Sequence, residues 1–292
     1  MKKYIGFDIG GTRVKHAVIY DNGEIKVKGA YDTNYKCRNK FIEDILKVIK
    51  IYKLKYDISG IGISMPGFVN PCTGHTEKAG AIEVMHNQNL KEILHDNIEL
   101  PIEIDNDANC AALAERYSGN AVNCNDYVLM TVGTGIGGAI ITDGKLLYGH
   151  NFRGGEIGFM TITEDTDGVK TISENCSTRG LLEEYKKYKN IDKEASVDGR
   201  EVFEAAREDK ELSKIIDAWF ERLSRAVFNL AVILNPEKIL IGGGISERKD
   251  FVENILNHLE KNKYWEDLKV EVSACKHRND AGIIGSVYKF LS

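Results

Sequence analysis

Hydrophobic and polar positions follow the period of a strand in some parts of the chain and the period of a helix in others. Short apolar or alternating runs predict strands, and apolar residues three or four apart predict helices. The strand pattern occupies residues 4–8, 14–20, 58–65, 238–241 and 270–274. The helix pattern occupies residues 41–52, 90–94, 178–184, 199–209, 213–234 and 250–261, and a final helix ends at Phe290. Strands that alternate with helices predict an α/β fold.

One hairpin pattern occurs twice. Residues 4–23 and residues 127–144 each follow the order strand, glycine-rich turn, strand, and tight turn with aspartate and glycine. An accidental match would require the same strand pattern twice. The repeat therefore indicates a duplicated domain in which each half offers one glycine-rich loop.

A polar cluster follows the strand pattern that begins at Ile102. Asp105, Asn106 and Asp107 come directly before small apolar residues, which are typical of a helix start and predict a helix to about residue 117. In α/β sheets, ligands bind beyond the carboxyl ends of strands. Asn and Asp also favour turns, so the cluster alone does not distinguish a functional site from a plain strand terminus.

Length and charge narrow the function classes. The chain has 292 residues and a formal net charge of −5, and its Lys and Arg residues are dispersed. This length predicts two domains, and the acidic balance argues against nucleic acid or an anionic membrane as a partner. The six cysteines form no Cys-x-x-Cys pair, and no apolar run is long enough for a membrane span. We expect a cytoplasmic protein.

The first glycine-rich turn has features of a phosphate-binding loop. Gly10 and Gly11 let the backbone approach a phosphate closely, and Thr12 and Lys15 add a hydroxyl and a cation. Asp8 lies where a carboxylate can hold a water molecule bound to Mg²⁺. A plain hairpin turn also explains this pattern.

Two further glycine runs complete a nucleotide site. Gly133, Thr134 and Gly135 repeat the first loop, and Gly243 and Gly244 follow a short strand. Adjacent glycines leave backbone open to a flat group such as adenine. Two phosphate loops, an adenine shelf and a carboxylate at a strand end suggest phosphoryl transfer from ATP and Mg²⁺ to a small acceptor.

Five runs of residues resemble the signature series of the ROK family of sugar kinases, in the family's order and over nearly the whole chain. They are 8–12 (DIGGT), 106–109 (NDAN), 133–138 (GTGIGG), 156–158 (EIG) and 242–244 (GGG). The resemblance implies an actin-like (ribonuclease-H-like) ATPase fold with two α/β lobes and a central cleft. It also implies a homodimer and transfer of the γ-phosphoryl group of ATP to a hexose 6-hydroxyl. The lobes are expected at residues 1–117, with the helix at about 280–292 packing back, and at 118–279.

The resemblance also implies roles for single residues. Asp107 matches the catalytic base of the family. Asp105 competes from the residues alone, but motif position decides for Asp107 and makes Asp105 a structural or supporting residue. Asn106 and Glu156 match sugar-binding positions, and Gly67 falls at a Pro-Gly turn beside the sugar. The second sugar-binding glutamate is Glu174 or Glu183. We favour Glu174, because Glu183 is expected well inside a helix.

The departures from the family pattern concern zinc and the sugar. Phe159 replaces a histidine that touches sugar and a structural zinc in most members, and the zinc loop with three clustered cysteines is missing. Only Cys176 lies nearby, so we predict no zinc site. An apolar ring at residue 159 suits a sugar whose anomeric oxygen is substituted.

The zinc-free pattern resembles the β-glucoside kinases of the family, which phosphorylate the non-reducing glucose of cellobiose and related glucosides. The matching runs are 65–67, 155–160, 174–176, 242–248 and 279–282. An N-acetylmannosamine kinase or a glucokinase is the alternative. A non-catalytic sugar-sensing regulator of the family is a different class, disfavoured by the intact Asn106-Asp107 pair and by a first loop that begins at residue 8.

Overall fold

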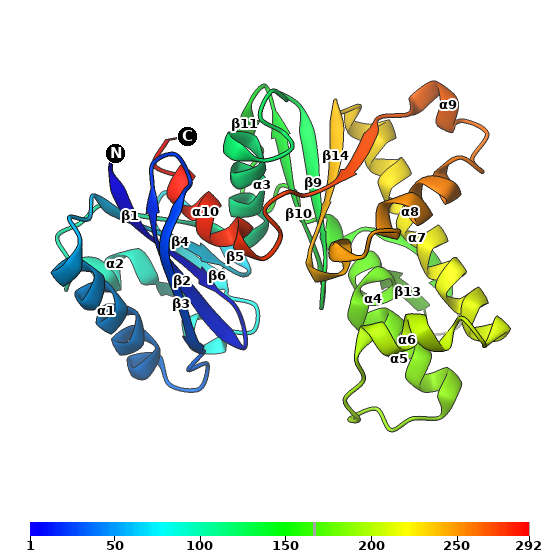
Figure 1. Cartoon of the computed structure of the whole chain (residues 1–292), viewed down its shortest axis with the longest axis horizontal. Helices are drawn as coiled ribbons and strands as arrows, with labels where there is room; N and C mark the ends of the chain where they lie inside the picture. Colours follow the sequence, from blue (N-terminus) through cyan, green and yellow to red (C-terminus); the bar gives the residue numbers. More distant parts are fainter. Residues whose placement is uncertain (166–167, 292) are drawn as a thin grey trace. The chain divides into compact units, whose positions relative to one another are not determined.

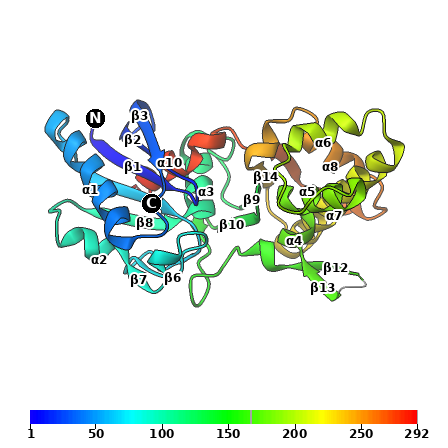
Figure 2. The same ribbon diagram turned by 90° about the horizontal axis from the view of Figure 1, so that it is seen from below.

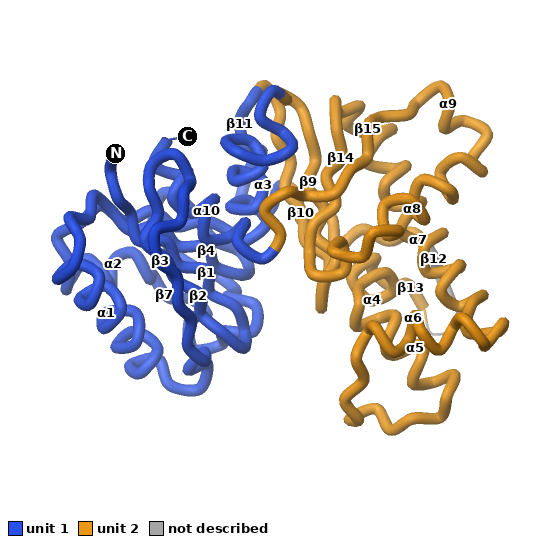
Figure 3. Tube along the Cα trace, in the orientation of Figure 1, with its two compact units in different colours: residues 1–123, 144–154, 279–292 blue, residues 124–143, 155–278 orange. Residues whose placement is uncertain are grey.

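The computed structural model describes residues 1–165 and 168–291, which Figure 1 and Figure 2 show in two views. The chain divides into two compact units (Figure 3). Unit 1 contains residues 1–123, 144–154 and 279–292, and unit 2 contains residues 124–143 and 155–278. These units differ from the lobes expected at 1–117 and 118–279 chiefly because residues 144–154 belong to unit 1.

Unit 1 is built on a mixed sheet. Its strand order is β3 (Ile25–Asp32), β2 (Arg13–Tyr20), β1 (Lys3–Ile9), β4 (Gly60–Met65) and β8 (Ile102–Asn106). β1 pairs antiparallel with β2 and parallel with β4, and β4 pairs parallel with β8. The carboxyl ends of β1, β4 and β8 therefore meet at one edge of the sheet, where Asp8 and Asn106 lie.

Helices cover both faces of this sheet. α1 (Arg38–Lys55) and α2 (Leu90–His95) bury Phe41 and Leu90 in one hydrophobic cluster with Phe7. On the other face, α10 (Ala281–Tyr288) packs Ile283 against Tyr4. α3 (Asp107–Ser118) lies beside α10 (Figure 1). Successive residues of a strand point to opposite faces, so β1 contributes to both layers.

A small antiparallel sheet lies in unit 1 after β4 (Figure 2). Its strands are β5 (Phe68–Val69), β6 (His75–Lys78) and β7 (Gln88–Asn89), with the short 3₁₀ helix η1 (Glu83–Met85) between β6 and β7. The hydrophobic pattern does not predict this sheet, because β5 and β7 have only two residues each. Unit 1 also contains the two-residue strand β11 (Lys145–Leu146).

Unit 2 repeats the strand order of unit 1. Neighbouring strands are β10 (Ile136–Thr142), β9 (Tyr127–Val132), β14 (Lys238–Gly242) and β15 (Glu271–Ala274). β9 is antiparallel to β10 and parallel to β14, which is parallel to β15. This order matches β2, β1, β4 and β8, so the predicted duplicated α/β fold of the actin-like class is confirmed.

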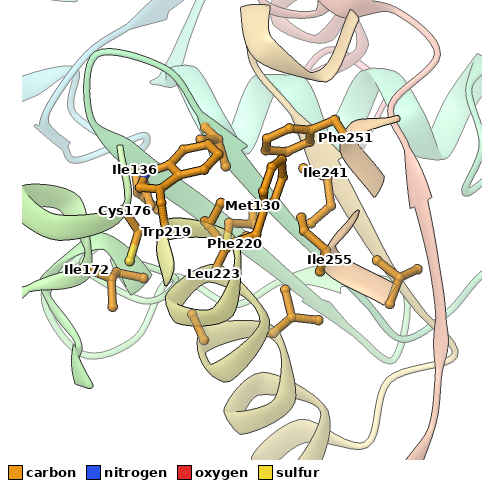
Figure 4. Close-up of a cluster of buried hydrophobic side chains, with 14 of the residues drawn as sticks. Met130, Ile136, Ile172, Cys176, Trp219, Phe220, Leu223, Ile241, Phe251 and Ile255 are labelled. Carbon is orange, nitrogen blue, oxygen red and sulfur yellow. The ribbon is translucent and has the colours of Figure 1, made fainter. Parts of the chain in front are cut away.

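The core of unit 2 lies between its sheet and its helices (Figure 4). Trp219 and Phe220 of α7 (Lys210–Leu234) contact Phe251 of α8 (Phe251–Leu259). The remaining elements are α4 (Ile172–Cys176), α5 (Thr178–Lys189), α6 (Gly199–Ala205), α9 (Trp265–Leu268), β12 (Thr161–Asp165), β13 (Gly168–Thr171), η2 (Ile157–Phe159) and η3 (Gly244–Glu247). A last 3₁₀ helix, η4 (Arg278–Asp280), precedes α10.

None of the helices in the described part of the chain combines the length and the apolar character that a membrane span requires.

Candidate active site

The polar cluster at the end of β8 is fixed by helix capping. Asn106 is the N-cap of α3, and its Oδ1 accepts from the backbone N–H of Ala108 at 2.8 Å and of Asn109 at 3.2 Å. These bonds satisfy two of the free N–H groups of the first helical turn. Asp107 is therefore held as the first residue of α3, where the positive end of the helix dipole favours a carboxylate.

The amide nitrogen of Asn106 stabilises the turn that follows β4. Its Nδ2 donates to the carbonyl of Gly67 at 3.0 Å. Gly67 has φ +95°, and a Cβ atom there would lie 1.8 Å from the carbonyl oxygen of Lys78, so only glycine fits. Asn106 thus joins Gly67 to the start of α3, and part of its hydrogen-bonding capacity serves the fold.

Asp107 has a perturbed pKa. Surrounding protein desolvates its carboxyl group and the negative charge of Asp8 adds to this effect, so the pKa of Asp107 rises to about 6. The backbone N–H of Ala108 opposes the shift. Asp107 is nevertheless exposed as a residue, so the desolvation that raises its pKa does not close it off from solvent. It is an accessible group that changes protonation near neutral pH.

Asp8 lies at the end of β1 with two partners. The hydroxyl of Ser64 donates to its Oδ1 at 3.1 Å, and Nζ of Lys15 lies 3.1 Å from its Oδ2. Lys15 also donates to the carbonyl of Asn279 at 2.8 Å. Nζ of Lys15 is therefore held by Asp8 and Asn279. If Lys15 binds a phosphate, it would do so while it keeps these two contacts.

The first glycine-rich turn is braced by a residue that the sequence did not indicate. The N–H of Gly10 donates to the carbonyl of Arg13 at 3.0 Å, which closes the turn. Thr33 donates from its hydroxyl to the carbonyl of Gly10 at 2.7 Å and from its N–H to that of Thr12 at 2.9 Å. Thr33 is buried, so it fixes the loop that contains Gly11 from the side of β3.

Asp105, expected as a structural or supporting residue, is the centre of a buried network whose members Tyr148 and Lys289 the sequence did not indicate. Its carboxylate accepts from the hydroxyl of Tyr148 at 2.6 Å and from Nδ2 of Asn109 at 2.9 Å, and Nζ of Lys289 lies 3.1 Å away. Lys289 also donates to the hydroxyl of Tyr148. Asp105 is fully buried, in contrast to Asp107, which supports the choice of Asp107 as the reactive carboxylate.

The second glycine-rich loop lies in unit 2, against the start of α4 and α5. The N–H of Gly133 donates to the carbonyl of Gly135 at 3.0 Å, and the carbonyl of Gly133 accepts from the N–H of Thr178 at 2.8 Å. Ser173, which the sequence did not indicate, accepts from the N–H of Ile136 at 3.0 Å. Thr134 and Gly135 remain exposed.

Gly243 and Gly244 differ in what surrounds them. Gly243 has φ +88°, and a Cβ atom there would lie 2.2 Å from the carbonyl oxygen of Val132. A Cβ atom on Gly244 would meet no atom within 4 Å. The backbone at Gly244 is therefore open, as a shelf for a flat ring requires.

Glu156 and Phe159 flank the short helix η2 of unit 2. Glu156 is its N-cap, and its carbonyl accepts from the N–H of Phe159 at 3.2 Å. Phe159 is 64% exposed. An aromatic side chain at the surface can make an apolar contact with a ligand.

The two glutamates that compete for the second sugar position lie in different helices. Glu174 forms a capping box at the start of α4, because its Oε2 accepts from the N–H and the hydroxyl of Thr171 at 2.8 Å each. Glu183 lies on α5 with Oε1 3.9 Å from Nε of Arg179. Since these contacts do not test sugar binding, the choice of Glu174 over Glu183 stays a prediction.

In the part of the chain that the structure describes, no zinc cluster is found where the family motif would place one. Within residues 1–165 and 168–291, no three His, Cys, Asp or Glu side chains are grouped as metal ligands. Burial raises the pKa of the Cys176 thiol to about 12, which disfavours the thiolate that binds zinc. In this region Arg222 instead donates to Glu184 at 2.6 Å and to the carbonyl of Asn175 at 3.4 Å. The absence of zinc from the protein stays a prediction for metal analysis.

The predicted site residues fall into two groups. Asp8, the loop at residues 10–12, Lys15, Gly67 and the pair at 106–107 lie in unit 1. Glu156, Phe159, Glu174, the loop at 133–135 and the pair at 243–244 lie in unit 2. Within unit 1, hydrogen bonds connect Gly67 to Asn106, and the charge of Asp8 acts on Asp107.

Comparison with known proteins gives the family. The model of the ROK family matches residues 4–291. A β-glucoside kinase of Listeria monocytogenes is 34% identical over 294 residues, which cover 99% of this chain and 97% of the relative. The solved Lmo2764 protein of Listeria monocytogenes, named as a candidate N-acetylmannosamine kinase, has a TM-score of 0.90 and 32% identity, covering 99% of this chain and 98% of its own. A ROK family protein from Streptococcus pneumoniae, solved with sucrose, has a TM-score of 0.88 and 27% identity, covering 99% and 98%. This chain belongs to the ROK family.

Proposed function

We propose that this chain is an ATP-dependent sugar kinase that phosphorylates the 6-hydroxyl of a hexose, the glucose unit of a β-glucoside such as cellobiose. The observation that carries the proposal is Asp107, an accessible carboxylate at a helix start whose pKa is raised to about 6. A general base is most effective when its pKa lies near the working pH.

Asp107 would accept the proton of the sugar hydroxyl as its oxygen attacks the γ-phosphorus of ATP. The bond from the γ-phosphorus to the β–γ bridging oxygen breaks, and ADP leaves. Asn106 and Gly67 would orient the sugar beside Asp107, and Glu156 would bind its hydroxyls. Positioning and charge neutralisation supply most of the rate in this reaction class.

The residues present fit a nucleotide. The open backbone at Gly244 suits the flat adenine ring. The loops at residues 10–12 and 133–135 suit phosphate oxygens, because each turns through glycine at the end of a strand and can present N–H groups other than those of Gly10 and Gly133, which close the turns.

Asp8 fits a magnesium ion held through water. Kinases hold Mg²⁺ with one or two carboxylates and the substrate phosphates. The negative charge of Asp8 raises the pKa of Asp107, which shows that the electrostatic potential near the two carboxylates is negative. A cation bound there would offset this negative potential. When bound there, Mg²⁺ would neutralise negative charge on the phosphate groups of the nucleotide.

The β-glucoside is favoured over other sugars for two reasons. The relative from Listeria monocytogenes that is 34% identical is named a β-glucoside kinase. Phe159 offers an apolar surface where a free anomeric hydroxyl would need a hydrogen-bond partner. N-acetylmannosamine is the second candidate, because the solved structure with a TM-score of 0.90 is named for that sugar.

A sugar panel tests the proposal. ATP-coupled assays with cellobiose, methyl β-glucoside, glucose, N-acetylmannosamine and N-acetylglucosamine should give the highest kcat/KM for cellobiose. Phosphorus-coupled NMR of the product should place the new ester on the 6-oxygen of the non-reducing glucose. Turnover of N-acetylmannosamine alone would replace the substrate, and no turnover of any sugar would overturn the kinase.

A further inference from the structure

The segment at residues 149–154 contains a bulky residue in a rarely occupied backbone conformation. Phe152 adopts φ +61°, in the left-handed region that bulky side chains rarely occupy. Its ring packs edge-on against Tyr148, with 6.2 Å between ring centroids. Backbone conformations of this kind cluster at active sites and at segments that clamp ligands. The next residue along the chain is Arg153.

Arg153 is bound to two residues of the small sheet in unit 1. Its guanidinium carbon lies 4.6 Å from the centroid of the Phe68 ring, and its Nη2 lies 2.6 Å from Oε1 of Glu77. Phe68 pairs with Lys78 across β5 and β6, so Glu77 is the next residue along the partner strand. Arg153 and Glu77 are 38% and 51% exposed, and an ion pair this exposed adds little to stability.

These contacts lie next to the predicted acceptor site. Phe68 directly follows Gly67, so the two Cα atoms are about 3.8 Å apart. The carbonyl of Gly67 accepts from Asn106, and Asn106 directly precedes Asp107. The Arg153–Phe68 pair therefore lies one residue beyond the turn that would contact the sugar, on the side of β5.

We propose that Arg153 and Phe68 form a subsite for the second hexose ring of a disaccharide, the ring attached to the anomeric oxygen of the phosphorylated glucose. This inference rests on the proposed kinase function. A guanidinium group has five N–H donors, so donors beyond the Glu77 contact are available to sugar hydroxyls. The Phe68 ring supplies an apolar surface for the C–H groups of the second ring. Glu77 holds Arg153 in place.

The test measures kcat/KM along a series in which only the aglycone grows: glucose, methyl β-glucoside and cellobiose. Arg153→Met keeps a flexible, unbranched side chain, although a shorter one, and removes its N–H donors. We expect it to lower kcat/KM for cellobiose about tenfold, and to change the values for glucose and methyl β-glucoside by less than about twofold. Phe68→Leu and Glu77→Gln should lower kcat/KM by a smaller factor. The loss should again be largest for cellobiose and small for glucose and methyl β-glucoside.

Two further variants serve as controls. Arg200→Met removes an exposed arginine of unit 2 that pairs with Asp198 at 2.7 Å. This variant should leave kcat/KM unchanged for all three substrates. Arg153→Lys keeps the positive charge without the planar fork and should lose part of the cellobiose activity. If Arg153→Met does not fold stably, Arg153→Lys serves as the second variant that tests the subsite.

The outcomes separate this inference from the kinase proposal. An equal loss of kcat/KM on all three substrates would show a structural role for Arg153 and overturn the subsite. Unchanged cellobiose kinetics in both Arg153 variants would overturn it too. Wild-type turnover of glucose without turnover of cellobiose would overturn the subsite while leaving a sugar kinase. If the wild type phosphorylated no sugar, the proposed function itself would fall.

Discussion

The ammonium nitrogen of Lys289 lies 3.1 Å from Oδ2 of Asp105, a residue that solvent does not reach. Tyr148 donates to the same oxygen at 2.6 Å, and the N–H of Asn106 and Nδ2 of Asn109 donate to the other at 2.8 and 2.9 Å. One carboxylate thus connects β8, the start of α3, the segment at 144–154 and the C-terminal end of the chain. Because a buried charge is costly without partners, these groups should act as a unit.

Asp105→Asn should destabilise the protein strongly. The substitution leaves the Lys289 ammonium, whose side chain is 15% exposed, without its counter-charge, and breaking such a pair costs on the order of 3–5 kcal/mol. Urea denaturation followed by circular dichroism measures the loss. The double variant Asp105→Asn with Lys289→Met removes both charges and should recover part of it. A single variant as stable as the wild type would contradict the role of the pair.

Asp107→Asn should abolish turnover without loss of nucleotide binding. An amide cannot accept the proton of the sugar hydroxyl, and loss of a general base lowers kcat by roughly 10²–10⁴-fold. Isothermal titration with a non-hydrolysable ATP analogue checks that the nucleotide site is intact. Asp198→Asn, an exposed carboxylate of unit 2, is the control and should keep kcat. Wild-type kcat in Asp107→Asn would remove this residue from its proposed role.

The pH dependence of kcat/KM should report the pKa of Asp107. The base acts only when deprotonated, so activity should fall as the pH drops through about 6, and it should level off above that value. Asp8→Asn removes the negative charge that helps to raise this pKa, so the acid limb of the pH profile should move to lower pH. This shift should appear even if the substitution lowers the maximal kcat/KM. An acid limb at the same pH in both proteins would argue against the coupling of the two carboxylates.

Local patterns were sufficient to predict most of the fold. The apolar run at residues 4–8 predicted the buried strand β1, and the alternation at residues 14–20 predicted β2, in which the burial of successive residues varies more. The same pattern at 127–144 identified the repeat. β5 and β7 escaped prediction because two residues contain no periodicity.

The candidate site was only partly predictable for the same reason. Asn106 and Asp107 stand out in the sequence because polar residues there interrupt an apolar strand and a helix of small residues. The partners of Asp105 leave no such trace, since Tyr148 and Lys289 are 141 positions apart and meet only in the folded chain. Thr33 and Ser173 likewise act through hydrogen bonds to distant backbone, which no local pattern indicates.

Glu174→Gln should separate sugar binding from helix capping. Glutamine retains the capping box that Glu174 forms with Thr171, so thermal stability should change little. If the carboxylate binds sugar hydroxyls, the KM for cellobiose should rise about tenfold while the KM for ATP stays unchanged. Glu183→Gln, on the exposed face of α5, is the matched control. The opposite pattern, with KM raised only in Glu183→Gln, would transfer the role to Glu183.

Phe159→His should shift specificity toward sugars with a free anomeric hydroxyl. Phe159 is 64% exposed, so the substitution costs little packing energy and introduces a hydrogen-bond donor. The anomeric hydroxyl loses water when the sugar binds, and a hydrogen-bond partner that replaces this water raises kcat/KM by roughly a factor of ten. The ratio of kcat/KM for glucose to that for cellobiose should therefore rise about tenfold. Phe159→Leu removes the aromatic ring without adding a donor and should not improve glucose. If histidine left the ratio unchanged, Phe159 would not determine the choice between free and substituted sugars, and the preference would have to come from elsewhere in the acceptor site.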